Sequence, residues 1–115
     1  MLAQLINLAM VEKMRFSAYK EEETHIGGGV YRIFDKHRKV IYVGKSNDLH
    51  KRIHAHLNGQ THTKKFTKHM RHVDWHRNDS PIMQTLLEGI LIAYYKPKHN
   101  DEVKDEEANK KKQEK

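Results

Sequence analysis

The stretch GVYRIFDKHRKVIYVG, residues 29–44, decides the fold. β-Branched and aromatic residues fill both of its ends, as is typical of β-strands, and five polar or charged residues lie between them. We therefore predict a β-hairpin with strands at 30–34 and 40–44. Tyr31 and Tyr42 can lie close together across its paired strands, although packing is the usual role of two strand tyrosines.

Around this hairpin the pattern predicts mainly helices. Apolar residues recur at helical spacing in 2–20, 49–57 and 80–95, and the lysine-rich stretch 64–71 predicts a short basic helix. Residues 73–77 alternate as in a third strand. We expect an α+β fold, in which helices flank a small, mainly antiparallel sheet of three strands and one extra helix lies at the N-terminus.

A chain of 115 residues is normally a single domain. We expect an amphipathic N-terminal helix and joint at 1–26, the main domain at 27–100, and a charged, disordered tail at 101–115. The sequence has no cysteine, which excludes disulfides and thiolate metal sites. Its apolar runs are too short to cross a membrane, and it has no signal-peptide pattern, so we expect a cytoplasmic protein.

The chain is strongly basic, and its charged residues are unevenly distributed along the sequence. The formal net charge is +7, and the tail contains six acidic residues and five lysines, about −1, so residues 1–100 hold about +8. A basic surplus in the main domain favours a polyanionic partner such as nucleic acid. A basic domain that binds nothing remains the alternative.

Three side chains suggest phosphate chemistry. Arg52 and His56 are four residues apart, so they share one helix face, which we place at the border between core and solvent. Arginine can bind a phosphate through two donors, and histidine can exchange a proton near neutral pH. Glu88 is the only charged residue in 80–95, and a carboxylate in apolar surroundings suits Mg²⁺. A solvent-facing Glu88, or one paired with Arg52, remains open.

Two other patterns are rejected. Gly44-Lys45-Ser46 imitates the end of a nucleotide-binding P-loop, but the glycine required five residues earlier is Lys39. His50 and His54 have the spacing of a zinc pair, but they point away from the face of Arg52 and His56, and no further ligand accompanies them.

The order of these motifs resembles that of the GIY-YIG nuclease family. The spacing is most similar to the N-terminal incision domain of bacterial excision-repair nucleases, and the resemblance covers residues 27–100. The matching positions are Gly29-Val30-Tyr31, Tyr42-Val43-Gly44, Lys45 through Arg52, His56, Glu88 and Asn100.

The resemblance implies an endonuclease that hydrolyses DNA phosphodiester bonds with one divalent cation, Mg²⁺ or Mn²⁺. Whether Tyr31 or His56 is the general base stays open, and a tyrosine base would need a lowered pKa, which Lys45, Arg52 and the metal can provide. The implied roles are metal binding by Glu88, base or base assistance by Tyr31, positioning of water or phosphate by Tyr42 and His56, transition-state stabilisation by Arg52, phosphate contact by Lys45, and support of the site by Gly29, Gly44 and Asn100.

The sequence does not distinguish single-stranded, duplex and branched DNA. For each of them we expect further contacts from the basic stretch, namely Lys64, Lys65, Lys68 and Arg71. One rival is a catalytically silent nucleic-acid-binding module. Another is a nuclease subunit that forms a homodimer or docks on a protein partner through its N-terminal helix, which exposed Leu2, Leu5 and Met10 would support.

Overall fold

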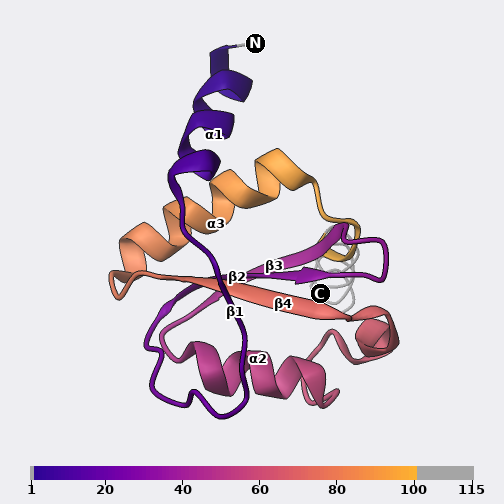
Figure 1. The fold of residues 1–115 in the computed structure, drawn as a ribbon. Helices are drawn as coiled ribbons and strands as arrows, with labels where there is room; N and C mark the ends of the chain where they lie inside the picture. Colours follow the sequence, from indigo (N-terminus) through magenta and orange to yellow (C-terminus); the bar gives the residue numbers. More distant parts are fainter. Residues whose placement is uncertain (1, 101–115) are drawn as a thin grey trace, which may run out of the picture.

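The computed structural model describes residues 2–100, with side chains for Leu5 and for residues 8–100, so the expected tail lies outside the described part. The chain forms an α+β fold, as predicted (Figure 1). No helix in the described part is long and apolar enough to cross a membrane. The elements are α1 (Leu2–Lys13), β1 (Ser17–Ala18), β2 (Gly29–Phe34), β3 (Val40–Ser46), α2 (Leu49–Leu57), the 3₁₀ helix η1 (Lys64–His69), β4 (His72–Arg77) and α3 (Pro81–Tyr95).

The sheet is antiparallel in the order β1-β4-β2-β3, with four strands where three were predicted. The extra strand corrects the expected helix over 2–20, because α1 ends at Lys13 and Ser17–Ala18 pairs with Trp75 and Asp74 of β4. The amide of Tyr19 also donates to the carbonyl of Val73 (2.8 Å). Strand pairing therefore outweighs helical spacing here, since it satisfies backbone groups on the outer edge of β4.

The predicted hairpin is confirmed. β2 and β3 pair directly, and the turn between them closes with the Asp35 amide donating to the Lys39 carbonyl (2.9 Å). The Asp35 carboxylate accepts hydrogen bonds from the amides of His37 (2.8 Å) and Lys39 (3.0 Å). A short acidic side chain thus stabilises the turn by taking up free backbone donors.

Helices cover both faces of the sheet. In Figure 1, α2 lies under one face, while α3 crosses the other face and carries α1 on its outer side. Alternate strand residues serve the two layers: Ile33 packs with Leu49 and Ile53 of α2, whereas Val30 and Val43 pack with α3. The sheet therefore holds two helices at fixed positions, one on each side of β3.

Short polar side chains cap the starts of the two main helices. The carboxylate of Asp48 accepts from the Lys51 amide (3.1 Å) at the start of α2, and the hydroxyl of Ser80 accepts from the Met83 amide (3.3 Å) at the start of α3. The predicted basic helix is instead the 3₁₀ helix η1, which is interrupted by non-helical angles at Phe66. Phe66 is the buried side chain of η1, and such a short segment with one anchor suits a 3₁₀ turn.

An ion pair on the α3 side of the sheet fixes the remaining elements. Nε of Arg32 donates to Asp74 (2.8 Å), and Nη1 donates to the hydroxyl of Tyr95 (2.6 Å) at the end of α3. The guanidinium also lies 3.5 Å from the ring centre of Phe16, in the segment after α1. These contacts join α3 and the N-terminal segment to the central strands.

Candidate active site

The two tyrosines are diagonal neighbours rather than directly opposite. Tyr31 pairs with Gly44, and Ile33 pairs with Tyr42, so the two ring centres are 6.4 Å apart. Both rings belong to the core cluster on the α2 side of the sheet. The expectation that they lie close together is therefore correct, although their strand pairs are two positions apart.

Both motif glycines are required by close contacts. A Cβ at Gly44 would lie 2.2 Å from the hydroxyl oxygen of Tyr31, because the phenol crosses directly over this position. A Cβ at Gly29 would lie 2.1 Å from the carbonyl oxygen of His76 on the neighbouring strand. The glycine in the second motif thus makes room for the tyrosine of the first.

His56 is fully buried, at 0% exposure, and Nε2 lies 2.6 Å from the Tyr31 hydroxyl. This corrects its expected place at the border between core and solvent. His56 follows Leu49 by seven residues and Ile53 by three, so it continues the apolar stripe of α2. Its spacing from Arg52 alone had suggested the border position.

Two threonines that sequence analysis did not single out hold the other side of His56. Nδ1 lies 2.6 Å from the hydroxyl of Thr63, which is itself fully buried, and 3.0 Å from that of Thr61. The two hydroxyls are 2.6 Å apart. The only signal in the sequence is a Thr-x-Thr just after the helix ends, which is too common to indicate a site.

Burial decides the protonation of this network. It lowers the pKa of His56 to about 3, with further lowering by Arg52 and His62, so the imidazole is neutral near pH 7. A neutral imidazole has one N–H donor and one acceptor nitrogen, and both ring nitrogens have a hydroxyl partner, Tyr31 at Nε2 and Thr63 at Nδ1. The ring is thereby held in one orientation.

Burial also raises the pKa of Tyr31 well above its ordinary value, and Tyr42 and Glu88 raise it further. Arg52 lowers this pKa by its charge and by a hydrogen bond, but the lowering is the smaller effect. The expected lowered pKa of Tyr31 is therefore wrong for the protein chain by itself. The phenol is neutral near pH 7 and acts first as a hydrogen-bond donor.

Glu88 lies half-buried on α3, next to the buried Leu87. Burial raises the pKa of Glu88, and the charge of Lys45 opposes that shift. Nζ of Lys45 is held by the hydroxyl of Thr85, one turn before Glu88 (2.7 Å). The charge of Glu88 also contributes to the raised pKa of Tyr31, so these two groups lie within electrostatic reach of each other.

Asn100 braces β3 from outside the sheet. Its side-chain oxygen accepts from the amide of Val43, and its side-chain nitrogen donates to the carbonyl of the same residue, both at 2.8 Å. Val43 lies between Tyr42 and Gly44 on the outer strand. The amide therefore acts like one residue of an additional strand and fixes the backbone that carries the site.

Residues 27–101 match the model of the UvrC-like GIY-YIG domain. The chain belongs to this family. As a GIY-YIG domain it is 37% identical over 83 residues to UvrABC system protein C of Shewanella frigidimarina, and 34% identical to the protein of that name from Haemophilus ducreyi. The matching stretch is 70% of this chain but 14% of each of these relatives.

Solved structures of GIY-YIG domains agree with the fold. The N-terminal endonuclease domain of UvrC from Thermotoga maritima, bound to magnesium as its catalytic divalent cation, is similar with a TM-score of 0.59 and 28% identity. The match covers 69% of this chain and 89% of that domain. A point mutant of the same domain, also bound to the cation, matches with the same TM-score and identity over 69% of this chain and 88% of that one.

The donor set of this GIY-YIG domain fits a hard, hydrated cation. The described residues contain no group of three histidine, cysteine, aspartate or glutamate side chains that could hold a metal ion. Glu88 is a half-buried carboxylate with a raised pKa. Mg²⁺ is commonly held by one or two carboxylates, with water and substrate phosphate completing its shell, so Glu88 suits it.

The basic residues of η1 extend the site on the α2 side. Lys64, Lys65 and Lys68 are exposed, while Phe66 packs inward with its ring centre 6.4 Å from that of Tyr42. Nη1 of Arg71 donates to the carbonyls of Lys68 and Met70, which holds its guanidinium near the chain. The stretch therefore adjoins the tyrosines, and its DNA contacts stay a prediction.

Proposed function

We propose that this chain is a metal-dependent endonuclease that hydrolyses DNA phosphodiester bonds with a single Mg²⁺ or Mn²⁺ ion. The observation that carries the proposal is the half-buried Glu88, within electrostatic reach of the buried Tyr31–His56 pair. The related domain from Thermotoga maritima, named as an endonuclease with a catalytic magnesium ion, supports it. DNA as the substrate is supported by the likeness to UvrABC system protein C.

Glu88 would hold the cation, which supplies charge neutralisation at the phosphate. Its burial serves this role, because an unpaired carboxylate in a half-apolar site binds a cation more favourably than a fully hydrated one. Lys45, held by Thr85, would contact a phosphate oxygen at the same place.

Arg52 would stabilise the transition state. Its planar guanidinium can donate two hydrogen bonds to the phosphate oxygens as negative charge develops there. The same group hydrogen-bonds Tyr31, so the charge is placed beside the phenol.

Tyr31 and His56 would handle the proton of the attacking water as a pair. The hydroxyl oxygen of Tyr31 can accept a hydrogen bond from that water while the phenol's own proton is donated to Nε2 of His56. Tyr31 and His56 are both neutral in the chain. The general base would therefore be the hydrogen-bonded Tyr31–His56 pair, and not a phenolate formed before the substrate binds. Tyr42 would position the water or the phosphate.

We further propose residues 27–100 as the catalytic unit, closed by the Asn100 clamp, within a cytoplasmic protein. The segment before it would serve contact with a second copy or a protein partner. Leu5 of α1 is 59% exposed, as that role requires, whereas Met10 is half-buried and the side chain of Leu2 lies outside the described set.

The proposal is tested with Glu88→Ala and Glu88→Gln, compared with Glu22→Gln at an exposed position of the joint. Single-stranded, duplex and branched DNA are incubated with Mg²⁺, Mn²⁺ or EDTA. Cleavage should need the cation and fall by about 10³-fold or more in both Glu88 variants, since a bound metal contributes several kcal/mol. Glu22→Gln should cleave like the wild type.

DNA binding in EDTA, measured by fluorescence anisotropy, separates this from the rival classes. Binding without cation-dependent cleavage would identify a silent binding module. Cleavage that survives in Glu88→Ala would remove Glu88 from the site. Oligomeric state, measured by sedimentation of the wild type and Leu5→Gln, tests the partner segment.

A further inference from the structure

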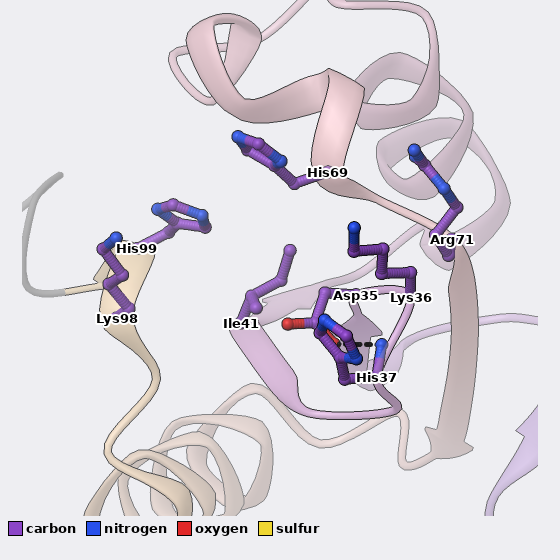
Figure 2. A pocket seen from close by; sticks show the side chains of 8 residues that line it. All are labelled: Asp35, Lys36, His37, Ile41, His69, Arg71, Lys98 and His99. Carbon is purple, nitrogen blue, oxygen red and sulfur yellow. Dashed lines mark hydrogen bonds between the residues drawn. The ribbon is translucent and has the colours of Figure 1, made fainter.

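A basic pocket lies beside the turn of the β2–β3 hairpin (Figure 2). Its volume is about 320 Å³, and three separate segments line it: the hairpin, the junction between η1 and β4, and the segment after α3. In Figure 2 the side chains of the three segments surround a common space, with Lys36 reaching toward His69. Its polar wall consists of Lys36, His37, His69, Arg71, Lys98 and His99, with Asp35.

The charge of the pocket is suited to an anion. Lys36, Arg71 and Lys98 give three positive charges against the one negative charge of Asp35, a surplus of two before any histidine is protonated. Hydrogen bonds from the Lys39 and His37 amides lower the pKa of Asp35 and keep its carboxylate on the turn backbone. The acid therefore stabilises the turn while the cations face the pocket.

The walls are held in place by the fold. The Arg71 guanidinium is anchored on two carbonyls, and the Arg71 amide donates to the carbonyl of Phe34 (2.8 Å). The ring of His99 stacks on Phe66 with centres 3.9 Å apart and planes within 4°. The fixed Arg71 and His99 lose little conformational entropy when an anion binds, whereas Lys36 and Lys98 are exposed and supply charge.

Two chain connections join the pocket to the active site. Ile41 lines the pocket and precedes Tyr42, and His99 precedes Asn100. Ile41 and Gly44 are three residues apart on β3, which is about 10 Å of strand. Since a DNA strand carries one phosphate per nucleotide, a strand that lies in the active site can place a nearby phosphate in the pocket.

We propose that this pocket binds a backbone phosphate of the substrate DNA, on the strand that is cleaved and within a few nucleotides of the cleaved bond. The inference rests on the proposed endonuclease function and adds a second anchor for the strand, apart from Lys64, Lys65 and Lys68. It fixes the register of the strand on the protein and reads no base.

The test is the double variant Lys36→Gln/Lys98→Gln, matched by Lys13→Gln/Lys20→Gln, which removes two exposed lysines outside the pocket. The pocket variant should raise KM about tenfold with kcat within about twofold, and should flatten the dependence of log Kd on log[salt] by about one unit. The matched control should show neither change. Equal losses in both double variants would mean that only net charge matters and would overturn the proposal.

A scan of the DNA gives the position. Single uncharged methylphosphonate linkages are placed one to six nucleotides on each side of the cleaved bond, and binding is measured in EDTA. One linkage within this range should weaken wild-type binding and leave binding by the pocket variant unchanged. Equal losses of binding affinity at every position would show that no single phosphate occupies this pocket.

The binding measurements in EDTA, taken together with the cleavage assay, separate this inference from the proposed function. Wild-type binding that shows the position effect, without any cleavage, would leave the pocket in place and reject the endonuclease. Cleavage with no position effect would keep the endonuclease and reject the pocket, and a chain that binds no DNA would overturn both.

Discussion

The Tyr31–His56–Thr63 network and the basic pocket beside the hairpin turn differ in almost every physical respect. The network is buried, and 2.6 Å hydrogen bonds join its members in one chain. The pocket is formed by exposed lysines and an arginine whose charges lie near water. The hydrogen bonds of the network depend on the exact positions of its side chains and on the exclusion of water. The attraction of the pocket for an anion depends on the number of its positive charges and weakens as the salt concentration rises. Substitutions of the same kind should therefore have different effects in the two regions.

The largest difference is expected for one substitution made twice, Arg52→Lys and Arg71→Lys. Both keep the positive charge and lose the planar guanidinium. At Arg52, kcat should fall about 10²–10³-fold, because two aligned donors at the phosphate are lost. At Arg71, kcat/KM should change no more than about threefold, since charge is retained. Single-turnover kinetics on both variants measure this, and equal losses would contradict the comparison.

Gly44→Ala should come next. The new Cβ would overlap the Tyr31 hydroxyl, so the phenol must move by about 1 Å, which is expected to lower cleavage about 10²-fold. The matched control is Gly89→Ala, beside Glu88, where a Cβ meets nothing within 4 Å. It should raise stability by about 1 kcal/mol through helix propensity and leave cleavage unchanged. Thermal unfolding and cleavage rates are measured together, and normal cleavage by Gly44→Ala would contradict the contact.

Thr63→Val should have a smaller effect. The substitution keeps the shape of the side chain but removes the hydroxyl that His56 Nδ1 contacts, at a cost of about 1–3 kcal/mol in stability. Cleavage should fall about tenfold, because Thr61 still holds the ring from 3.0 Å. Thr63→Ser should restore most of both losses. A Val variant with unchanged pH dependence of kcat would show that the threonine only fills space.

The smallest effect is expected from mild acid. The pKa of His56 is about 3 in the folded chain and about 6.5 when unfolded, so between these values the unfolded state binds more protons. Stability should therefore fall as the pH drops below 6.5, by about 2 kcal/mol at pH 5. His56→Gln should lack this loss. Chemical denaturation at a series of pH values measures it, and a flat profile for the wild type would contradict the burial of a neutral His56.

Local rules predicted much of the fold. The hairpin, α2, α3 and the third strand were predicted because turn residues, caps and apolar spacing all act within a few residues of each other. The strand Ser17–Ala18 was missed, since its partner is β4, more than fifty residues away, and no pattern within two residues can reveal that pairing. The α-helix predicted over 64–71 was wrong because a single anchor, Phe66, fixes that segment.

The site was predicted by motif, and its details came from tertiary contacts. Arg52 and Glu88 act on the pKa of Tyr31, and Arg52 also acts on that of His56, while the catalytic roles of these residues stay a prediction. The full burial of His56, its threonine partners and the raised pKa of Tyr31 depend on how α2 packs on the sheet. The sequence contains these residues but not the exclusion of water that sets their protonation.

The clamp of Asn100 on Val43 also affects how the molecule meets other molecules. β3 is the outermost strand, and an outer strand offers unpaired backbone groups to any extended peptide. Asn100 occupies those groups at Val43, beside the two motif residues, so a foreign strand cannot pair there. The edge of the sheet beside Tyr42 is thus protected against the addition of a further strand.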